Sequence, residues 1–215
     1  MSAGPGRPPA VVLCGGTSRR MGRDKALVEF HGVPLVARMY GALESLFPDV
    51  VLSVSGVEQE KAVRAVLQGG IASARMARYI PDAERDRGPL EGVRSSLQEL
   101  DVEYAFFVAV DMPNVPARVI NTLWETVRDS GCRGAVPTWD GQIEPACAFY
   151  SQQLLPEIEA ALARGERSLR QLVEWDGVLR VPVPATSLEF ASINTPEDLE
   201  RTEKLLDKRQ KESDP

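Results

Sequence analysis

Short apolar runs alternate with longer amphipathic segments along the first half of the chain. The runs are rich in β-branched and aromatic residues and end at glycine, proline or aspartate, which predicts buried parallel strands. These predicted strands cover Ala10–Cys14, Val50–Val54, Arg78–Ile80 and Tyr104–Val110. Between them, apolar residues recur three and four positions apart, which predicts helices. The predicted helices cover Pro34–Leu46, Glu58–Leu67, Leu90–Leu100 and Pro116–Val127.

The second half of the chain follows this alternation less regularly. Strands are predicted at Gly134–Pro137, Ala146–Tyr150 and Leu179–Val183, and helices at Leu154–Leu162, Ser168–Val173 and Pro196–Leu206. The last helix has the clearest start. Thr195 precedes it as a suitable N-cap, and Glu197 and Asp198 lie in its first turn, where the helix dipole favours acids.

Strands that alternate with helices are typical of an α/β fold, with a single doubly wound, mostly parallel sheet and right-handed crossovers. Hydrophobic residues make up 43% of the chain and charged residues 26%, an ordinary globular composition. No repeat or linker divides the 215 residues. We therefore expect one domain over residues 10–206, after a disordered lead-in at 1–9 and before a charged tail at 207–215.

Composition narrows the classes of function. The net charge of −6 disfavours nucleic-acid binding, which usually needs a basic face. Cys14, Cys132 and Cys147 form no CxxC pair, so neither a zinc site nor a disulfide framework is expected, and the count fits a reducing cytoplasm. No apolar run reaches the length of a membrane span, and the first residues lack the apolar stretch of a secretory signal.

Glycines and cations are concentrated in the segment Leu13–Lys25, directly after the first predicted strand. Gly15 and Gly16 would let backbone N–H groups approach a phosphate without a Cβ in the way. Arginine and lysine side chains bind phosphate oxygens, and four of them follow within the segment. It has neither Walker A spacing nor the glycine spacing of dinucleotide-binding loops. The pattern favours phosphate binding over a surface loop with solvated charges. The four cations are Arg19, Arg20, Arg23 and Lys25.

Two more segments that follow predicted strands are candidates for the same site, Pro81–Gly92 and Asp111–Pro113. Parallel strands present their carboxyl ends at one edge of a sheet, so both segments are expected to converge with Leu13–Lys25 around one site. Asp111 is a candidate ligand for Mg²⁺, which prefers carboxylate and phosphate oxygens, although an Asp-x-Pro sequence also suits a simple turn. Asp82 on its own is typical of a turn.

Motifs in the same order along nearly the whole chain, from about Val11 to Leu206, resemble those of the MobA-like nucleotidyltransferases. This family has a Rossmann-like, glycosyltransferase-A-type fold. The first two matching segments are Leu13-Cys14-Gly15-Gly16 through Arg20-Met21-Gly22 and Asp24-Lys25, and Asp82 with Gly88-Pro89-Leu90-Glu91-Gly92. The others are Asp111-Met112-Pro113, Glu144-Pro145-Ala146 through Tyr150, Gly165-Glu166-Arg167-Ser168-Leu169-Arg170, and Ile193-Asn194-Thr195-Pro196-Glu197-Asp198-Leu199.

The resemblance implies transfer of GMP from GTP to the terminal phosphate of the molybdopterin cofactor, with release of pyrophosphate. It implies that Asp111 holds Mg²⁺ and that Arg20 and Lys25 stabilise the departing pyrophosphate. The attacking phosphate is already an anion, so no strong general base is expected. The resemblance also admits transient contact with cofactor-insertion proteins. The implied nucleotide-binding residues are Leu13, Cys14, Gly15, Gly16, Lys25, Ser53, Asp82, Gly88, Pro89 and Asp111, and the implied pterin-side residues are Arg167, Arg170 and Asn194.

Guanine is favoured over cytosine because Gly15-Gly16 and Gly88-Pro89-Leu90-x-Gly92 resemble the guanylyl-transferring members. By the same resemblance, Asp82 can accept hydrogen bonds from guanine N1–H and N2–H. The chain departs from the family at four positions, where Cys14 replaces alanine, Glu91 a small residue, and Ser53 and Ser192 asparagines. Two alternatives stay open: a cytidylyltransferase or other nucleotidyltransferase of this fold, and a non-catalytic nucleotide-binding homologue.

Overall fold

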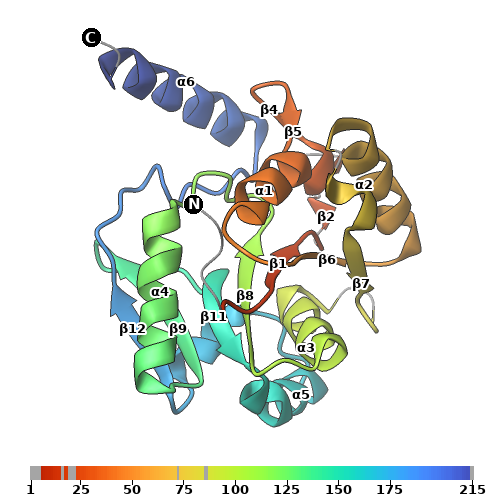
Figure 1. The fold of residues 1–215 in the computed structure, drawn as a ribbon, viewed down its shortest axis with the longest axis vertical. Helices are drawn as coiled ribbons and strands as arrows, with labels where there is room; N and C mark the ends of the chain where they lie inside the picture. Colours follow the sequence, from red (N-terminus) through yellow and green to blue (C-terminus); the bar gives the residue numbers. More distant parts are fainter. Residues whose placement is uncertain (1–5, 16, 19–22, 72, 85–86, 214–215) are drawn as a thin grey trace.

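One mixed sheet forms the centre of the molecule (Figure 1). The computed structural model describes residues 6–15, 17–18, 23–71, 73–84 and 87–213. Strands follow the order β10-β9-β11-β8-β1-β6-β7, and β12 lies beside β9. The strands are β1 (Ala10–Leu13), β6 (Val50–Val54), β7 (Arg78–Pro81), β8 (Tyr104–Ala109), β9 (Gly134–Trp139), β10 (Gln142–Ile143), β11 (Cys147–Ser151) and β12 (Val178–Pro182).

Helices cover both faces of the sheet. The alternation of β1 assigns the faces, because Val12 belongs to one buried cluster and Val11 to the other. The Val12 cluster contains residues of α1, α2 and α4, and the Val11 cluster contains residues of α3 and α5. The predicted doubly wound α/β class is therefore confirmed. The helices are α1 (Leu35–Glu44), α2 (Val57–Gly70), α3 (Pro89–Leu100), α4 (Ala117–Ser130), α5 (Leu155–Ala163) and α6 (Pro196–Ser213).

Four neighbouring strands, β7, β6, β1 and β8, are parallel, so their carboxyl ends lie at one edge of the sheet. In register, Leu13 at the end of β1 pairs with Ser53 of β6 and with Ala109 of β8. The sheet is mostly parallel, as predicted, but β11 runs antiparallel to β8 and to β9. The apolar pattern of a buried strand carries no information about its direction.

Short elements and helix ends are where the structure differs from the sequence prediction. The two-residue hairpins β2–β3 (Thr17–Ser18, Arg23–Asp24) and β4–β5 (Glu29–Phe30, Val33–Pro34) were not predicted, because two residues show no periodicity. Residues Leu169–Glu174 form a 3₁₀ helix, η4, at the helix predicted from Ser168 to Val173. Helix α2 continues through Gly69 and Gly70, past its predicted end at Leu67.

The start of α6 is fixed by reciprocal capping. The Asp198 N–H donates to Thr195 Oγ1 (3.1 Å), while Asp198 Oδ2 accepts from the Asn194 and Thr195 N–H groups (3.2 and 3.1 Å). The prediction of Thr195 as the N-cap is confirmed, and the cap holds the backbone of Asn194 in place. The helix itself extends to Ser213, past the predicted end, and projects from the body in Figure 1. Within the described ranges, no helix is both long and apolar enough to cross a membrane.

Candidate active site

Lys25, Asp111 and Asn194 meet at the carboxyl edge of the sheet, although they are far apart in sequence. Lys25 Nζ lies 2.7 Å from Asp111 Oδ2 and 2.5 Å from Asn194 Oδ1. The side chains of Lys25 and Asp111 are only 18% and 12% exposed, so this ion pair is largely shielded from water. Shielding strengthens the attraction between the two charges. One cation therefore already occupies a position lined by a carboxylate and an amide oxygen.

Backbone bonds place Asp111 at this point. The apolar strand β8 is buried in the sheet, and the Val110 N–H donates to Leu13 O (3.1 Å) just after β8 ends. The Met112 N–H then bonds to Ala109 O (3.1 Å), which closes a turn around Asp111. Across the site, the Ile193 N–H donates to Asp111 O (2.9 Å). The segment before α6 is thus tied directly to the end of β8, and Asn194 is carried to the same site.

Oxygen donors that hold an ammonium also suit a hard divalent cation. Mg²⁺ is usually bound by one or two carboxylates together with substrate phosphates and water. No three His, Cys, Asp or Glu side chains are clustered in the part of the chain that the structure describes. A closed protein cage is therefore missing there, but Asp111 and Asn194 fit an ion whose other ligands are phosphate oxygens. Lys25 would have to release Asp111 to admit such an ion.

The end of β1 forms the second part of the site. The Cys14 N–H donates to Ser53 O (2.9 Å), which continues the β1–β6 pairing past the strand. Cys14 is buried, and burial raises the pKa of its thiol, so it is packed as a small apolar group. A Cβ placed on Gly15 would lie 3.5 Å from Asp82 Oδ2, so the β1 loop and Asp82 are adjacent. The predicted convergence of the segments after β1 and β7 is found in the structure.

Small residues keep the wall of this part narrow. A Cβ on Gly92 of α3 would lie 2.7 Å from Ser53 Oγ, closer than real Cβ atoms come, and 3.0 Å from Leu13 Cδ2. Gly88, just before Pro89 starts α3, has a φ of 72° and approaches the backbone oxygen of Arg167. A Cβ there would lie 2.9 Å from that oxygen, so both the conformation and the contact need glycine.

Asp82 has an unusual proton affinity. Burial, with a smaller contribution from the nearby Glu91 carboxylate, raises the pKa of Asp82 to about 7, although Arg94 and the Ser53 hydroxyl act in the opposite direction. Its Oδ1 atom is buried and has no hydrogen-bond partner within the described residues. A buried acceptor without a donor is costly, so a ligand that supplies N–H groups would be favoured here.

Glu91 adds a negative charge near Asp82, but this charge is largely compensated. It is 2% exposed and lies 2.7 Å from Arg94 Nη2, one helical turn along α3. Burial acts to raise the pKa of Glu91, but hydrogen bonds from Arg94 and Ser95 outweigh it and lower the pKa below its ordinary value. Glu91 therefore stays ionised and acts on Asp82 through space.

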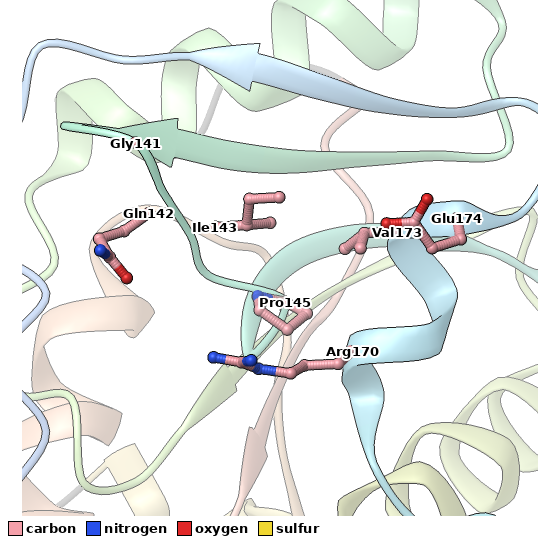
Figure 2. Close-up of a pocket in the computed structure, with 7 residues that line it drawn as sticks. All are labelled: Gly141, Gln142, Ile143, Pro145, Arg170, Val173 and Glu174. Atoms are coloured by element: carbon pink, nitrogen blue, oxygen red, sulfur yellow. The ribbon is translucent and has the colours of Figure 1, made fainter.

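Arg170 lies in a separate pocket of about 290 Å³, shown in Figure 2. The pocket is formed by the β9–β10 turn, Pro145 and η4, and Arg170 extends from η4 beneath Pro145. Glu144 is close enough to interact electrostatically with both Arg170 of this pocket and Asp111 of the Lys25 site. Burial raises the pKa of Glu144, and Asp111 adds to the rise. The residues lining the pocket are Gly141, Gln142, Ile143, Pro145, Arg170, Val173 and Glu174.

The structure thus brings most of the predicted nucleotide residues to one edge and divides the pterin-side residues. Asn194 contacts Lys25, Arg167 contributes its backbone beside Gly88, and only Arg170 lines the pocket. Gly16 and Arg20, with Arg19, lie outside the described residues, as does the side chain of Arg23. Gln59 of α2, whose amide bonds to Cys14 O and Asp24, was not predicted from the sequence, because a polar residue in a helix has no motif to mark it.

Comparisons with known proteins identify the family of this chain. The MobA-like NTP transferase domain matches residues 10–181. A probable molybdenum cofactor guanylyltransferase from Methanosarcina mazei is 38% identical over 200 residues, covering 89% of this chain and 88% of that protein. A molybdenum cofactor guanylyltransferase from Pseudomonas aeruginosa is 29% identical, covering 88% of this chain and 92% of that protein.

Solved structures give the same fold. A molybdopterin-guanine dinucleotide biosynthesis protein A from Archaeoglobus fulgidus superposes with a TM-score of 0.75 at 28% identity, covering 93% of this chain and 99% of that chain. A CMP:2-keto-3-deoxy-manno-octonic acid synthetase, 14% identical, superposes with a TM-score of 0.68, covering 94% and 99%, and shares the fold alone. The resemblance found in the sequence is confirmed, and the chain belongs to the MobA-like NTP transferase family.

Proposed function

We propose that this protein transfers GMP from GTP to the terminal phosphate of molybdopterin and releases pyrophosphate. The observation that carries the proposal is the contact of Lys25 with Asp111 and Asn194, beside Asp82 and the glycine-lined end of β1. The relatives named as molybdenum cofactor guanylyltransferases match over nearly the full chain and supply the substrate class. The three cysteines, unpaired and buried, support a reducing compartment such as the cytoplasm.

In this reaction an acceptor phosphate oxygen bonds to the α-phosphorus of GTP, and the bond from that phosphorus to the oxygen bridging to the β-phosphate breaks. Such transfers need alignment and charge neutralisation more than covalent help. Mg²⁺, when bound with the nucleotide, would neutralise phosphate charge beside Asp111. Lys25 would then bind the departing pyrophosphate, and Arg20 is proposed to do the same. The acceptor is already an anion, so no residue is assigned as a strong base.

We assign the guanine base to Asp82 and the acceptor to the Arg170 pocket. The ionised Asp82 carboxylate can accept from guanine N1–H and N2–H, and Oδ1 lacks another donor among the described residues. The Arg170 guanidinium offers a fork to an anionic group of the acceptor. The Glu144 carboxylate interacts electrostatically with both Asp111 and Arg170, so it is close to both halves of the proposed reaction. We place Arg167 and Asn194 near the acceptor but assign neither a direct contact with it.

Nucleotide preference is the direct test of this function. With Mg²⁺ present, GTP at a hundredfold excess over its Kd should stabilise the protein by about 2.7 kcal/mol, which a thermal-shift assay detects as a higher Tm. CTP and ATP at the same concentration should shift Tm much less. Pyrophosphate release with molybdopterin as acceptor should then require GTP. A clear preference for CTP would instead support a cytidylyltransferase, and binding without turnover a non-catalytic homologue.

The affinity for GTP is expected to fall as the solution becomes more acidic. Because the pKa of Asp82 is about 7, the carboxylate that accepts the guanine N–H groups is mostly ionised at pH 8 and mostly protonated at pH 6. The Kd for GTP should therefore rise about tenfold from pH 8 to pH 6. The stability of the ligand-free protein has the opposite pH dependence. Because the pKa of the Asp82 carboxyl group is raised in the folded state, the folded state loses stability as the pH rises toward 7.

Isothermal titration at the two pH values measures this dependence. The Asp82→Asn variant serves as the control, because it reports how the phosphates of GTP alone respond to pH. Binding by the wild type that follows the same pH profile as the variant would exclude Asp82 from base recognition.

A further inference from the structure

The side chain of Gln59, in the first turn of α2, makes four hydrogen bonds. Nε2 donates to Cys14 O (2.9 Å) and to Asp24 Oδ2 (2.8 Å), while Oε1 accepts from the Ser55 N–H (2.7 Å) and the Ser55 hydroxyl (3.0 Å). The orientation of the amide is determined by its partners. A carbonyl and a carboxylate can only accept, and a backbone N–H can only donate, so the amide has one fully bonded orientation.

The two bonds from Nε2 join points that lie ten residues apart in the chain, near the two ends of the segment Leu13–Lys25. Cys14 lies near the start of the segment, and its N–H donates to Ser53 O of β6. Asp24 lies near the end of the segment. Its other carboxylate oxygen, Oδ1, accepts from the Ala26 N–H (2.9 Å) and so caps the short 3₁₀ helix that contains Lys25. The orientation of Asp24 therefore determines how the helix that contains Lys25 is oriented at the end of the segment.

Packing does not require this glutamine. Helix α2 is anchored to the sheet by its buried residues, Val63 and Leu67. Both donor hydrogens of Gln59 are directed at the segment around the site, and none at the helix. We propose that Gln59 is a positioning residue. It holds the two ends of the segment Leu13–Lys25 together and so positions Lys25 to bind the phosphates of the nucleotide. This inference rests on the proposed function for its ligand but not for its geometry.

Gln59→Glu is the sharpest variant, because a glutamate cannot donate to Cys14 O and places a second carboxylate beside Asp24. Gln59→Met removes the hydrogen bonds without adding charge. Both should raise the KM for GTP, on the order of tenfold, while kcat falls less, since hydrogen bonds to charged groups contribute on this scale. Gln68→Glu is the matched control, because it makes the same change on the exposed face of the same helix. It should leave KM unchanged.

Hydrogen exchange of the ligand-free protein tests the geometry without GTP. Faster exchange confined to a peptide spanning residues 10–30 in both Gln59 variants, with normal exchange in β8 and α4, supports the proposal even if GTP proves not to be the substrate. Exchange and KM equal to those of Gln68→Glu would overturn it. Uniformly faster exchange across the whole chain would also overturn it, because Gln59 would then be an ordinary stabilising residue.

A charge rearrangement gives an independent test of the Gln59–Asp24 contact. In the double variant Gln59→Glu with Asp24→Asn, the amide introduced at position 24 can donate to the carboxylate introduced at position 59, while its oxygen still accepts from the Ala26 N–H. The double variant should have a lower KM for GTP than Gln59→Glu alone, although the bond to Cys14 O stays lost. Additive defects of the two single changes would show that the residues are not coupled and would contradict the proposal.

Discussion

Replacement of Asp111 by asparagine is expected to lower kcat on the order of 10³-fold while the protein stays folded. Asparagine keeps the shape and an oxygen acceptor for Lys25 Nζ, now 2.7 Å from Asp111 Oδ2, but removes the charge that would attract a divalent cation. Pyrophosphate release with saturating GTP, molybdopterin and Mg²⁺ measures the loss. Because the residue lies in a turn after β8 and not in the apolar core, the Tm should change by only a few degrees.

Metal binding separates this explanation from a general loss of activity. Mn²⁺ is a paramagnetic probe for a Mg²⁺ site, and its binding in the presence of GTP should weaken in Asp111→Asn. Asp129→Asn is the matched control, since Asp129 is 67% exposed and forms an ion pair with the neighbouring Arg128. An active Asp111→Asn enzyme with normal Mn²⁺ binding would remove Asp111 from the mechanism. An unfolded one would show that its role is structural.

The parts of the site that the sequence could indicate are those encoded locally. Apolar runs located β1, β6 and β8, and because parallel strands end at one edge, the segments after β1, β7 and β8 were expected to converge. Glycine and charge at those ends then indicated an anion site. The structure confirms the adjacency of Gly15 with Asp82 and of Lys25 with Asp111.

The remaining features depend on contacts between distant segments, which no local pattern records. Lys25 and Asn194 are 169 residues apart and are brought together because the backbone of Ile193 bonds to Asp111. Asn194, expected on the pterin side, holds the amine expected to bind pyrophosphate. The raised pKa of Asp82 needs both burial and Glu91, from a different element. Gln59 acts through Cys14 and Asp24, which lie 45 and 35 residues before it in the chain, so its role is visible only once these segments are placed together.

Replacement of Lys25 by alanine is expected to reduce kcat by roughly 10² to 10³-fold, because the leaving pyrophosphate loses a fixed positive charge. Lys25→Arg keeps a charge in a different shape and should retain part of the activity, whereas Lys25→Met keeps most of the volume without charge and should behave like alanine. Steady-state pyrophosphate release measures all three. Equal activity of Lys25→Met and wild type would show that the charge of Lys25 does not serve the reaction.

The same substitution should strengthen the binding of a divalent cation in the absence of nucleotide. In the ligand-free protein the Lys25 ammonium lies 2.7 Å from Asp111 Oδ2 and 2.5 Å from Asn194 Oδ1, so it competes for the oxygens that a metal ion would use. Without the amine, Mn²⁺ binding to the free protein should become tighter although turnover falls. These opposite signs distinguish a lysine that moves from Asp111 to the phosphates from one that only pairs with Asp111. If Lys25 were solely a structural partner of Asp111, its loss would destabilise the fold. Metal affinity and turnover would then change in the same direction.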